Sequence, residues 1–207
     1  MQKSSWFPLL TIAGAMLGLG LGLGLPLTPS ALADDEWTKI DCNGPDAHLQ
    51  PPPGIAANCF QGPFEMVRGE LDCRLSNYSV GSPPDGAEPR FYVHLRYPKR
   101  SGKTCATIGF RNPEKAMQHV HTVVESNATN WSAMQTVGDN VQLMFFDAKS
   151  QKRDGKCFTF TKTGPPAGKA GMGRLFTMIG FFCKAPGQPL DAAAATALID
   201  AIGVKPL

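Results

Sequence analysis

The stretch GPPAGKAGMGRLF (Gly164–Phe176) combines glycines with a lysine, as phosphate-binding loops do. A Walker loop has four residues between its first glycine and the Gly-Lys pair, and then a serine or threonine that binds magnesium. Here only three residues separate Gly164 from Gly168, and Ala170, which follows the lysine, has no hydroxyl group. The next residues resemble a strand, so no helix N-terminus would face a phosphate. We therefore expect no nucleotide to bind, and residues 164–173 to form a mobile connection between two strands.

His119 and His121 form an H-x-H pair, a second pattern that could do chemistry, because imidazole nitrogens bind transition metals. On a strand the two side chains would share a face, but on a helix they would point about 160° apart. The other histidines, His48 and His94, lie in unrelated segments. Since the surrounding residues favour a helix, we expect solvated histidines, no metal site and no cofactor.

The sequence contains no recognisable catalytic motif. There is no G-x-S-x-G elbow and no H-E-x-x-H, and the cysteine pattern leaves no thiol free to act as a nucleophile. Carboxylates are present, but spacing alone cannot pair them across a fold. We therefore assign no catalytic residue.

Six cysteines point to three disulfides: Cys42, Cys59, Cys73, Cys105, Cys157 and Cys183. The closest two are fourteen positions apart, whereas zinc ligands usually lie two to four residues apart. An even count with wide spacing, behind an export signal, is typical of structural bridges in an oxidising compartment. Six cysteines allow fifteen pairings, so the spacing alone does not define the connectivity.

Residues 1–33 have the three parts of a secretory signal peptide, which are a basic start, an uncharged apolar stretch and a cleavage site with small residues at Ala31 and Ala33. A retained membrane anchor is the alternative, because the apolar stretch is long enough to cross a bilayer. The cleavage site favours removal of the leader. We expect a mature protein that begins at Asp34 and lies in the periplasm or outside the cell.

The expected mature chain has 174 residues, which suits one domain with a sizeable core. Its net charge would be +2, one less than the +3 of the whole chain, because the leader contains Lys3 and no acidic residue. A charge so close to zero does not predict a nucleic-acid partner. No other apolar run is long enough for a transmembrane helix, so none is expected after cleavage.

Residues 34–63 are rich in proline and show little periodicity, so we expect a loop segment that precedes a single domain over residues 64–207. A local bridge between Cys42 and Cys59 is the simplest way to close this loop, although either cysteine could instead tie it to the domain body. Such a bridge would stabilise the folded state by about 3 kcal/mol.

The remaining residues alternate between strand and turn patterns. In RFYVHLRYP, Phe91, Val93 and Leu95 fall on one face, and polar residues that include His94 fall on the other, solvated face. Further strands are expected at Thr104–Phe110, in QTV and VQLMFFDA on either side of a Gly-Asp-Asn turn, in KCFTFTK, and in RLFTMIGFFC. The last is apolar on both faces, which is typical of a central strand.

An antiparallel register between KCFTFTK and RLFTMIGFFC sets Cys157 opposite Cys183, Phe158 opposite Phe182, and Phe160 opposite Gly180. Directly opposed residues lie within disulfide reach, so we predict a Cys157–Cys183 bridge. If Cys42 pairs with Cys59, elimination leaves Cys73 to pair with Cys105.

Two helices are expected. One begins at Pro113 and is capped by Asn112, and the other is capped by Asp191 with Gly203 as its stop. The overall prediction is an α+β fold with a mostly antiparallel sheet of about five or six strands, two helices and stabilising disulfides.

The absence of catalytic motifs favours an exported, non-enzymatic domain that binds a partner protein or an envelope component. The alternatives are a small extracytoplasmic hydrolase with a site assembled from scattered residues, and a carrier of a metal or small ligand.

Overall fold

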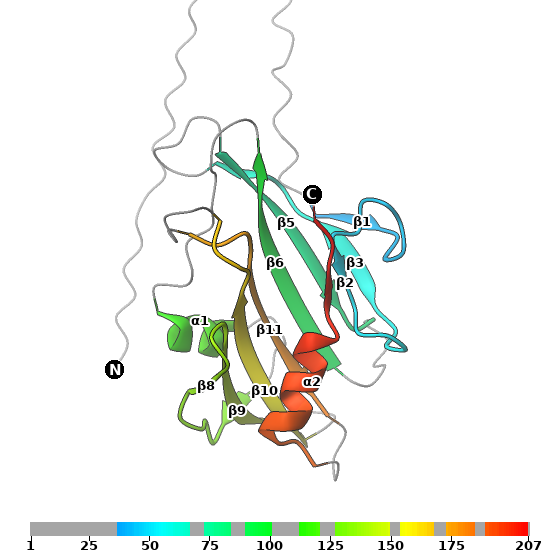
Figure 1. Cartoon of the computed structure of the whole chain (residues 1–207). Helices are drawn as coiled ribbons and strands as arrows, with labels where there is room; N and C mark the ends of the chain where they lie inside the picture. The colour runs from blue at the N-terminus through cyan, green and yellow to red at the C-terminus, as the bar shows by residue number, and fades with distance from the viewer. Residues whose placement is uncertain are drawn as a thin grey trace, which may run out of the picture. The chain divides into compact units, whose positions relative to one another are not determined.

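The structure is a computed structural model that describes residues 37–66, 73–83, 90–100, 112–120, 127–149, 154–167, 173–184 and 189–206. All of these residues belong to one compact unit, Ala33–Leu207. The elements, in chain order, are β1 (Thr38–Ile40), β2 (Leu49–Gln50), β3 (Asn58–Gln61), β4 (Glu65–Met66), β5 (Cys73–Gly81), β6 (Arg90–Arg100), α1 (Pro113–Val120), β7 (Asn127–Thr129), β8 (Gln135–Val137), β9 (Val141–Lys149), β10 (Asp154–Thr163), β11 (Thr177–Cys183), α2 (Ala192–Asp200) and β12 (Gly203–Val204) (Figure 1).

The strands form one antiparallel sheet of ten strands and a separate antiparallel pair, β2 with β12. The main path of the large sheet is β1-β3-β5-β6-β11-β10-β9-β7, with β4 also paired to β5 and β8 also paired to β9. All seven residues of β11 are buried, as a strand with two covered faces requires. The fold is therefore a mostly antiparallel sheet with helices, as expected, but it has more strands than the five or six predicted.

Each face of the large sheet carries its own core. One core contains Val93, Leu95 and Phe158, and α2 covers it with Ala195 and Ile199, all of them fully buried. The other core lies on the opposite face, where α1 packs against β9, β10 and β11. Among the residues that the structure describes, no helix has the length and hydropathy needed to cross a bilayer.

Both helices begin where the sequence predicts, because a side chain accepts a hydrogen bond from the first turn. Asn112 Oδ1 accepts from the Lys115 backbone N–H at 3.0 Å, and Asp191 Oδ1 accepts from the Ala194 N–H at 2.8 Å. The end of the second helix was predicted wrongly. It ends at Asp200, and Gly203 instead begins β12, whose pairing with β2 holds the chain after the helix.

Residues 34–63, which we predicted as a loop, contain β1, β2 and β3, and β1 and β3 belong to the large sheet. These strands are two to four residues long, too short for an alternating pattern to be visible in the sequence. The predicted strand at Thr104–Phe110 lies outside the described residues. The prediction also missed β5, which carries the buried polar residues Asn77 and Ser79 and so does not look apolar on either face.

The register predicted for β10 and β11 is present, with Cys157 opposite Cys183, Phe158 opposite Phe182, and Phe160 opposite Gly180. The two cysteines are bonded, with Cα atoms 4.0 Å apart. Hydrogen bonds continue this hairpin beyond the strands, from Leu175 N–H to the Pro165 carbonyl and from Ala167 N–H to the Gly173 carbonyl. Both ends of the glycine-rich segment are thus hydrogen-bonded, whereas we had expected the whole connection to be mobile.

A second disulfide joins Cys42 to Cys59, with Cα atoms 5.3 Å apart. It connects the turn after β1 to β3, and Cys59 is buried in the core. Cys73 begins β5, but its predicted partner Cys105 lies outside the described residues, so the Cys73–Cys105 pairing stays a prediction. The two bonds indicate an oxidising, extracytoplasmic environment.

Candidate functional site

The candidate site lies on the sheet face opposite α2, where polar side chains of β5 and β6 meet. In the register of these strands, Asn77 is opposite Arg96 and Ser79 is opposite His94. Since side chains alternate along a strand, these four residues share one face, and the core residues Val93 and Leu95 share the other. The sheet therefore positions a group of polar side chains at fixed spacing next to its β1–β3 edge.

A break in the neighbouring strand faces Asn77. Both β3 and β4 pair with the same edge of β5, and residues 62–64 separate them. The Gly62 N–H still donates to the Asn77 carbonyl at 2.8 Å, but Pro63 has no N–H with which to continue the ladder. The Asn77 side chain holds the break instead, because its Nδ2 donates to the Pro63 carbonyl at 2.8 Å.

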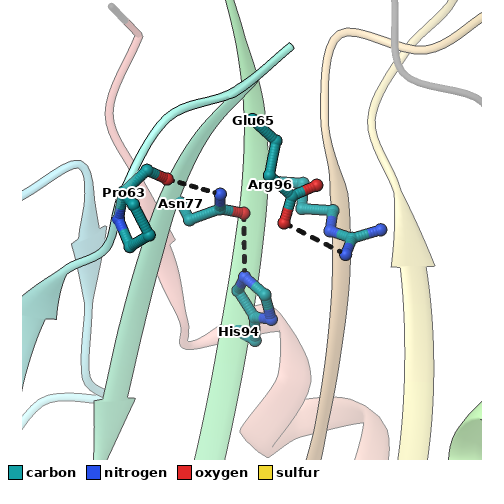
Figure 2. Close-up of polar contacts among 5 residues, drawn as sticks. All are labelled: Pro63, Glu65, Asn77, His94 and Arg96. Atoms are coloured by element: carbon teal, nitrogen blue, oxygen red, sulfur yellow. Dashed lines mark hydrogen bonds and ion pairs between the residues drawn. The ribbon is translucent and has the colours of Figure 1, made fainter. Parts of the chain in front are cut away.

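The Pro63 carbonyl also determines the hydrogen bonding of His94. A carbonyl only accepts, so the amide nitrogen of Asn77 must face Pro63, and its Oδ1 faces the His94 Nε2 at 3.1 Å (Figure 2). An amide oxygen also only accepts, so Nε2 carries the proton. In the neutral ring Nδ1 is then an acceptor, and no donor among the described residues bonds to it.

His94 is neutral in the fold over the physiological range. Burial, and secondarily the positive charge of Arg96, lower the pKa of His94 to about 4. The hydrogen bond from Nε2 to Asn77 is available to both protonation states, so it does not offset the cost of burying the charge. We had expected solvated histidines, but the ring of His94 is partly buried, and His48 packs against Tyr78 and contacts the Lys205 carbonyl at 3.3 Å.

Trp37 packs across the same face because Gly62 leaves room for it. Thr38 pairs with Gln61, so Trp37 and Gly62 lie one position beyond the end of the β1–β3 ladder. A Cβ at Gly62 would lie 2.9 Å from three atoms of the indole, which shows that the ring rests directly on the Gly62 backbone. The ring also meets His94 in an edge-on contact, with centroids 5.6 Å apart, and the side chain remains 40% exposed.

An ion pair borders the site. Arg96 Nη2 lies 3.5 Å from Glu65 Oε1, and both side chains are substantially exposed (Figure 2). A single long contact between exposed groups contributes little to stability. The other guanidinium N–H groups of Arg96 have no acceptor among the described residues, so they can donate hydrogen bonds to a ligand.

The residues singled out in the sequence lie elsewhere or outside the described region. His119 is in α1, as predicted, and His121 lies outside the described residues. No three His, Cys, Asp or Glu side chains among the described residues lie close enough together to hold a metal ion. Among the described residues, no serine, threonine or cysteine hydrogen-bonds to His94, so the site contains no activated nucleophile.

The residues of the site were missed for separate reasons. Asn77 lies in a strand that we did not predict, Pro63 was assigned to a loop, and Trp37 was in a segment with no expected partner. His94 was placed correctly on β6, but on a face that we expected to be solvated. The available signal was Gly62-Pro63 between two short β-type segments, which is typical of an interrupted edge strand.

Comparison with known proteins does not extend this description. No family model matches the chain, and neither a curated protein nor a solved structure matches it.

Proposed function

We propose that this chain is an exported, non-enzymatic domain of a bacterial periplasm, and that it binds a partner protein or an envelope component. Export is supported by the signal-peptide pattern of residues 1–33 and by the two disulfides. The site at the β1–β3 edge supports binding rather than catalysis, because it combines exposed aromatic rings with hydrogen-bonding groups and contains no activated nucleophile among the described residues.

One observation carries the proposal. Trp37 and Phe64 are two of three large apolar side chains that are exposed among the described residues, at 40% and 45%. Phe64 lies in the strand break, and the Trp37 ring rests on Gly62 in the same break. The third, Met134, lies between β7 and β8 at the opposite edge of the sheet. Aromatic residues next to hydrogen-bonding groups are typical of the centres of binding surfaces.

The hydrolase remains the second candidate, because His94 has the features of a general base. It is neutral, its Nε2–H is oriented by Asn77, and its Nδ1 has a free lone pair among the described residues, but a pKa of about 4 makes it a weaker base than an ordinary histidine. It would need a nucleophile or a water molecule supplied with the substrate. A hydrolytic activity lost in His94→Gln and retained in His48→Gln would favour this candidate over binding alone.

Site-specific crosslinking in the native envelope tests the binding proposal. A benzophenone amino acid replaces Phe64 in one variant, and Met134 in a control with similar exposure at the opposite sheet edge. We expect a discrete, light-dependent adduct at position 64 and none at position 134. Equal adducts at both positions, or none at either, would contradict the proposed binding surface.

A further inference from the structure

The indole of Trp37 is held in place before any ligand binds. The ring rests on the Gly62 backbone and makes a T-shaped contact with the His94 ring. Gly62 itself is buried, and its N–H bonds to the neighbouring strand β5. Because the support is backbone within a paired sheet, the exposed part of the indole is a rigid aromatic surface. Binding to such a surface costs little side-chain entropy.

Hydrogen-bonding groups of both kinds lie on the same sheet face as this ring. His94 offers Nδ1 as an acceptor, and Arg96, two residues along the same strand, offers guanidinium donors. Glu65, paired to Arg96, adds carboxylate acceptors. A ligand hydroxyl group both donates and accepts hydrogen bonds, so a neighbouring donor and acceptor match its chemistry.

The apolar area is small for a protein partner. A stable protein–protein interface buries about 1,200–2,000 Å² in total. At this edge, the large exposed apolar groups among the described residues are Trp37 and Phe64. The charged Arg96–Glu65 ion pair limits how far this apolar surface extends. A single fixed ring beside planar polar groups suits a ligand of the size of one or a few rings.

We propose that Trp37, His94 and Arg96 form a carbohydrate-binding site in which a pyranose ring stacks on the indole. A pyranose has an apolar face of C–H bonds, which packs on the negative face of an aromatic ring, and an edge of hydroxyl groups. The hydroxyl groups donate to His94 Nδ1 and accept from Arg96. This inference rests on the proposed binding function and narrows its envelope component to a glycan.

Glycan arrays and fluorescence titration test the inference. The purified mature protein is applied to an array of pyranose-containing glycans, and the strongest binder is then titrated in solution. Trp131 is replaced by Phe, so that the indole emission reports Trp37; Trp131 stacks on Phe146, with ring centroids 4.6 Å apart, near the opposite sheet edge. We expect saturable binding with a change in Trp37 emission.

Matched variants locate the site. Trp37→Ala should weaken binding at least about tenfold, as for a central aromatic contact, whereas Trp37→Tyr should retain part of the affinity. Gly62→Ala keeps the indole but moves it, because the added Cβ would lie 2.9 Å from the ring. Gly62→Ala should therefore also weaken binding. Met134→Ala, at the opposite edge, should bind as the unaltered protein does.

The outcomes separate this inference from the proposed function. Binding to no glycan on the array, or equal affinity in Trp37→Ala and Met134→Ala, would overturn the carbohydrate site. If a protein adduct nevertheless forms at position 64, the binding function stands and its partner is a protein. If neither a glycan nor an adduct is found, both fail. Thermal unfolding verifies that each variant is folded. If Trp37→Ala does not fold, the affinity of Trp37→Tyr tests the role of the ring instead.

Discussion

The neutral, partly buried ring of His94 should make the stability of the protein depend on pH. A histidine in the unfolded chain has a pKa near 6.5, and burial with the nearby charge of Arg96 lowers the pKa of His94 in the fold to about 4. The folded state therefore binds the proton more weakly than the unfolded chain does. The free energy of unfolding therefore has its full value, as far as His94 is concerned, above about pH 6.5. It decreases progressively as the pH falls from 6.5 to 4.

The size of the effect follows from the two pKa values. The difference between about 6.5 and about 4 corresponds to about 3 kcal/mol. Solvent at the partly exposed ring reduces this value, so we expect a loss of about 2–3 kcal/mol from His94 alone. This is a large fraction of the total stability of about 5–15 kcal/mol that is usual for a domain.

Urea unfolding at several pH values between 7.5 and 3.5 measures this contribution. His94→Gln removes the titration but keeps an amide N–H that can donate to Asn77 Oδ1. The stability difference between the wild type and His94→Gln should therefore shift by about 2–3 kcal/mol across this range, in favour of the variant at low pH. The comparison also cancels the titration of carboxylates that both proteins share.

His48→Gln is the control, because His48 packs near Tyr78, away from the Asn77–His94 pair. This variant should lose as much unfolding free energy between pH 6.5 and 4 as the wild type does. Parallel pH profiles for the wild type and His94→Gln would refute the assignment of a buried, neutral His94.

Three further predictions concern the fold. Non-reducing peptide mapping should link Cys157 to Cys183, and replacing both by alanine should lower the unfolding free energy by about 3 kcal/mol; a Cys157 peptide linked elsewhere would contradict the β10–β11 register. Phe158→Ala should cost about 3–5 kcal/mol in urea unfolding, because this ring is fully buried and stacks on Phe182, and a cost below 1 kcal/mol would exclude a tightly packed core there. Asp191→Ala should cost about 1 kcal/mol, with Asp191→Asn retaining most of the stability, because Asp191 Oδ1 caps the second helix; equal losses in the two variants would refute the cap.

The elements that the sequence predicted well are those with a strong local signal. Alternation of Phe91, Val93 and Leu95 predicted β6, and the apolar run around Phe181 predicted a central strand. The caps at Asn112 and Asp191 act within one turn of helix, so their residues are near each other in the chain. Such interactions depend on a few neighbouring residues, and they are readable without a tertiary structure.

The candidate site was not readable in this way, because its members come from separate segments. Trp37 precedes β1, Pro63 follows β3, Asn77 is in β5, and His94 is in β6. None of these residues is unusual in its own segment. Asn77 even obscured its strand, because a buried polar residue breaks the apolar pattern on which strand prediction depends.

The sequence by itself determined the strong strands and helix starts, and the register that brings Cys157 to Cys183, because each depends on local composition or on the pairing of consecutive strands. Only the tertiary structure decided the order of the strands, the break at Pro63 that Asn77 holds, and the neutral state of His94. The physical reason is that burial and hydrogen-bond partners depend on which strands become neighbours. That choice is made by packing over the whole sheet, and no single segment encodes it.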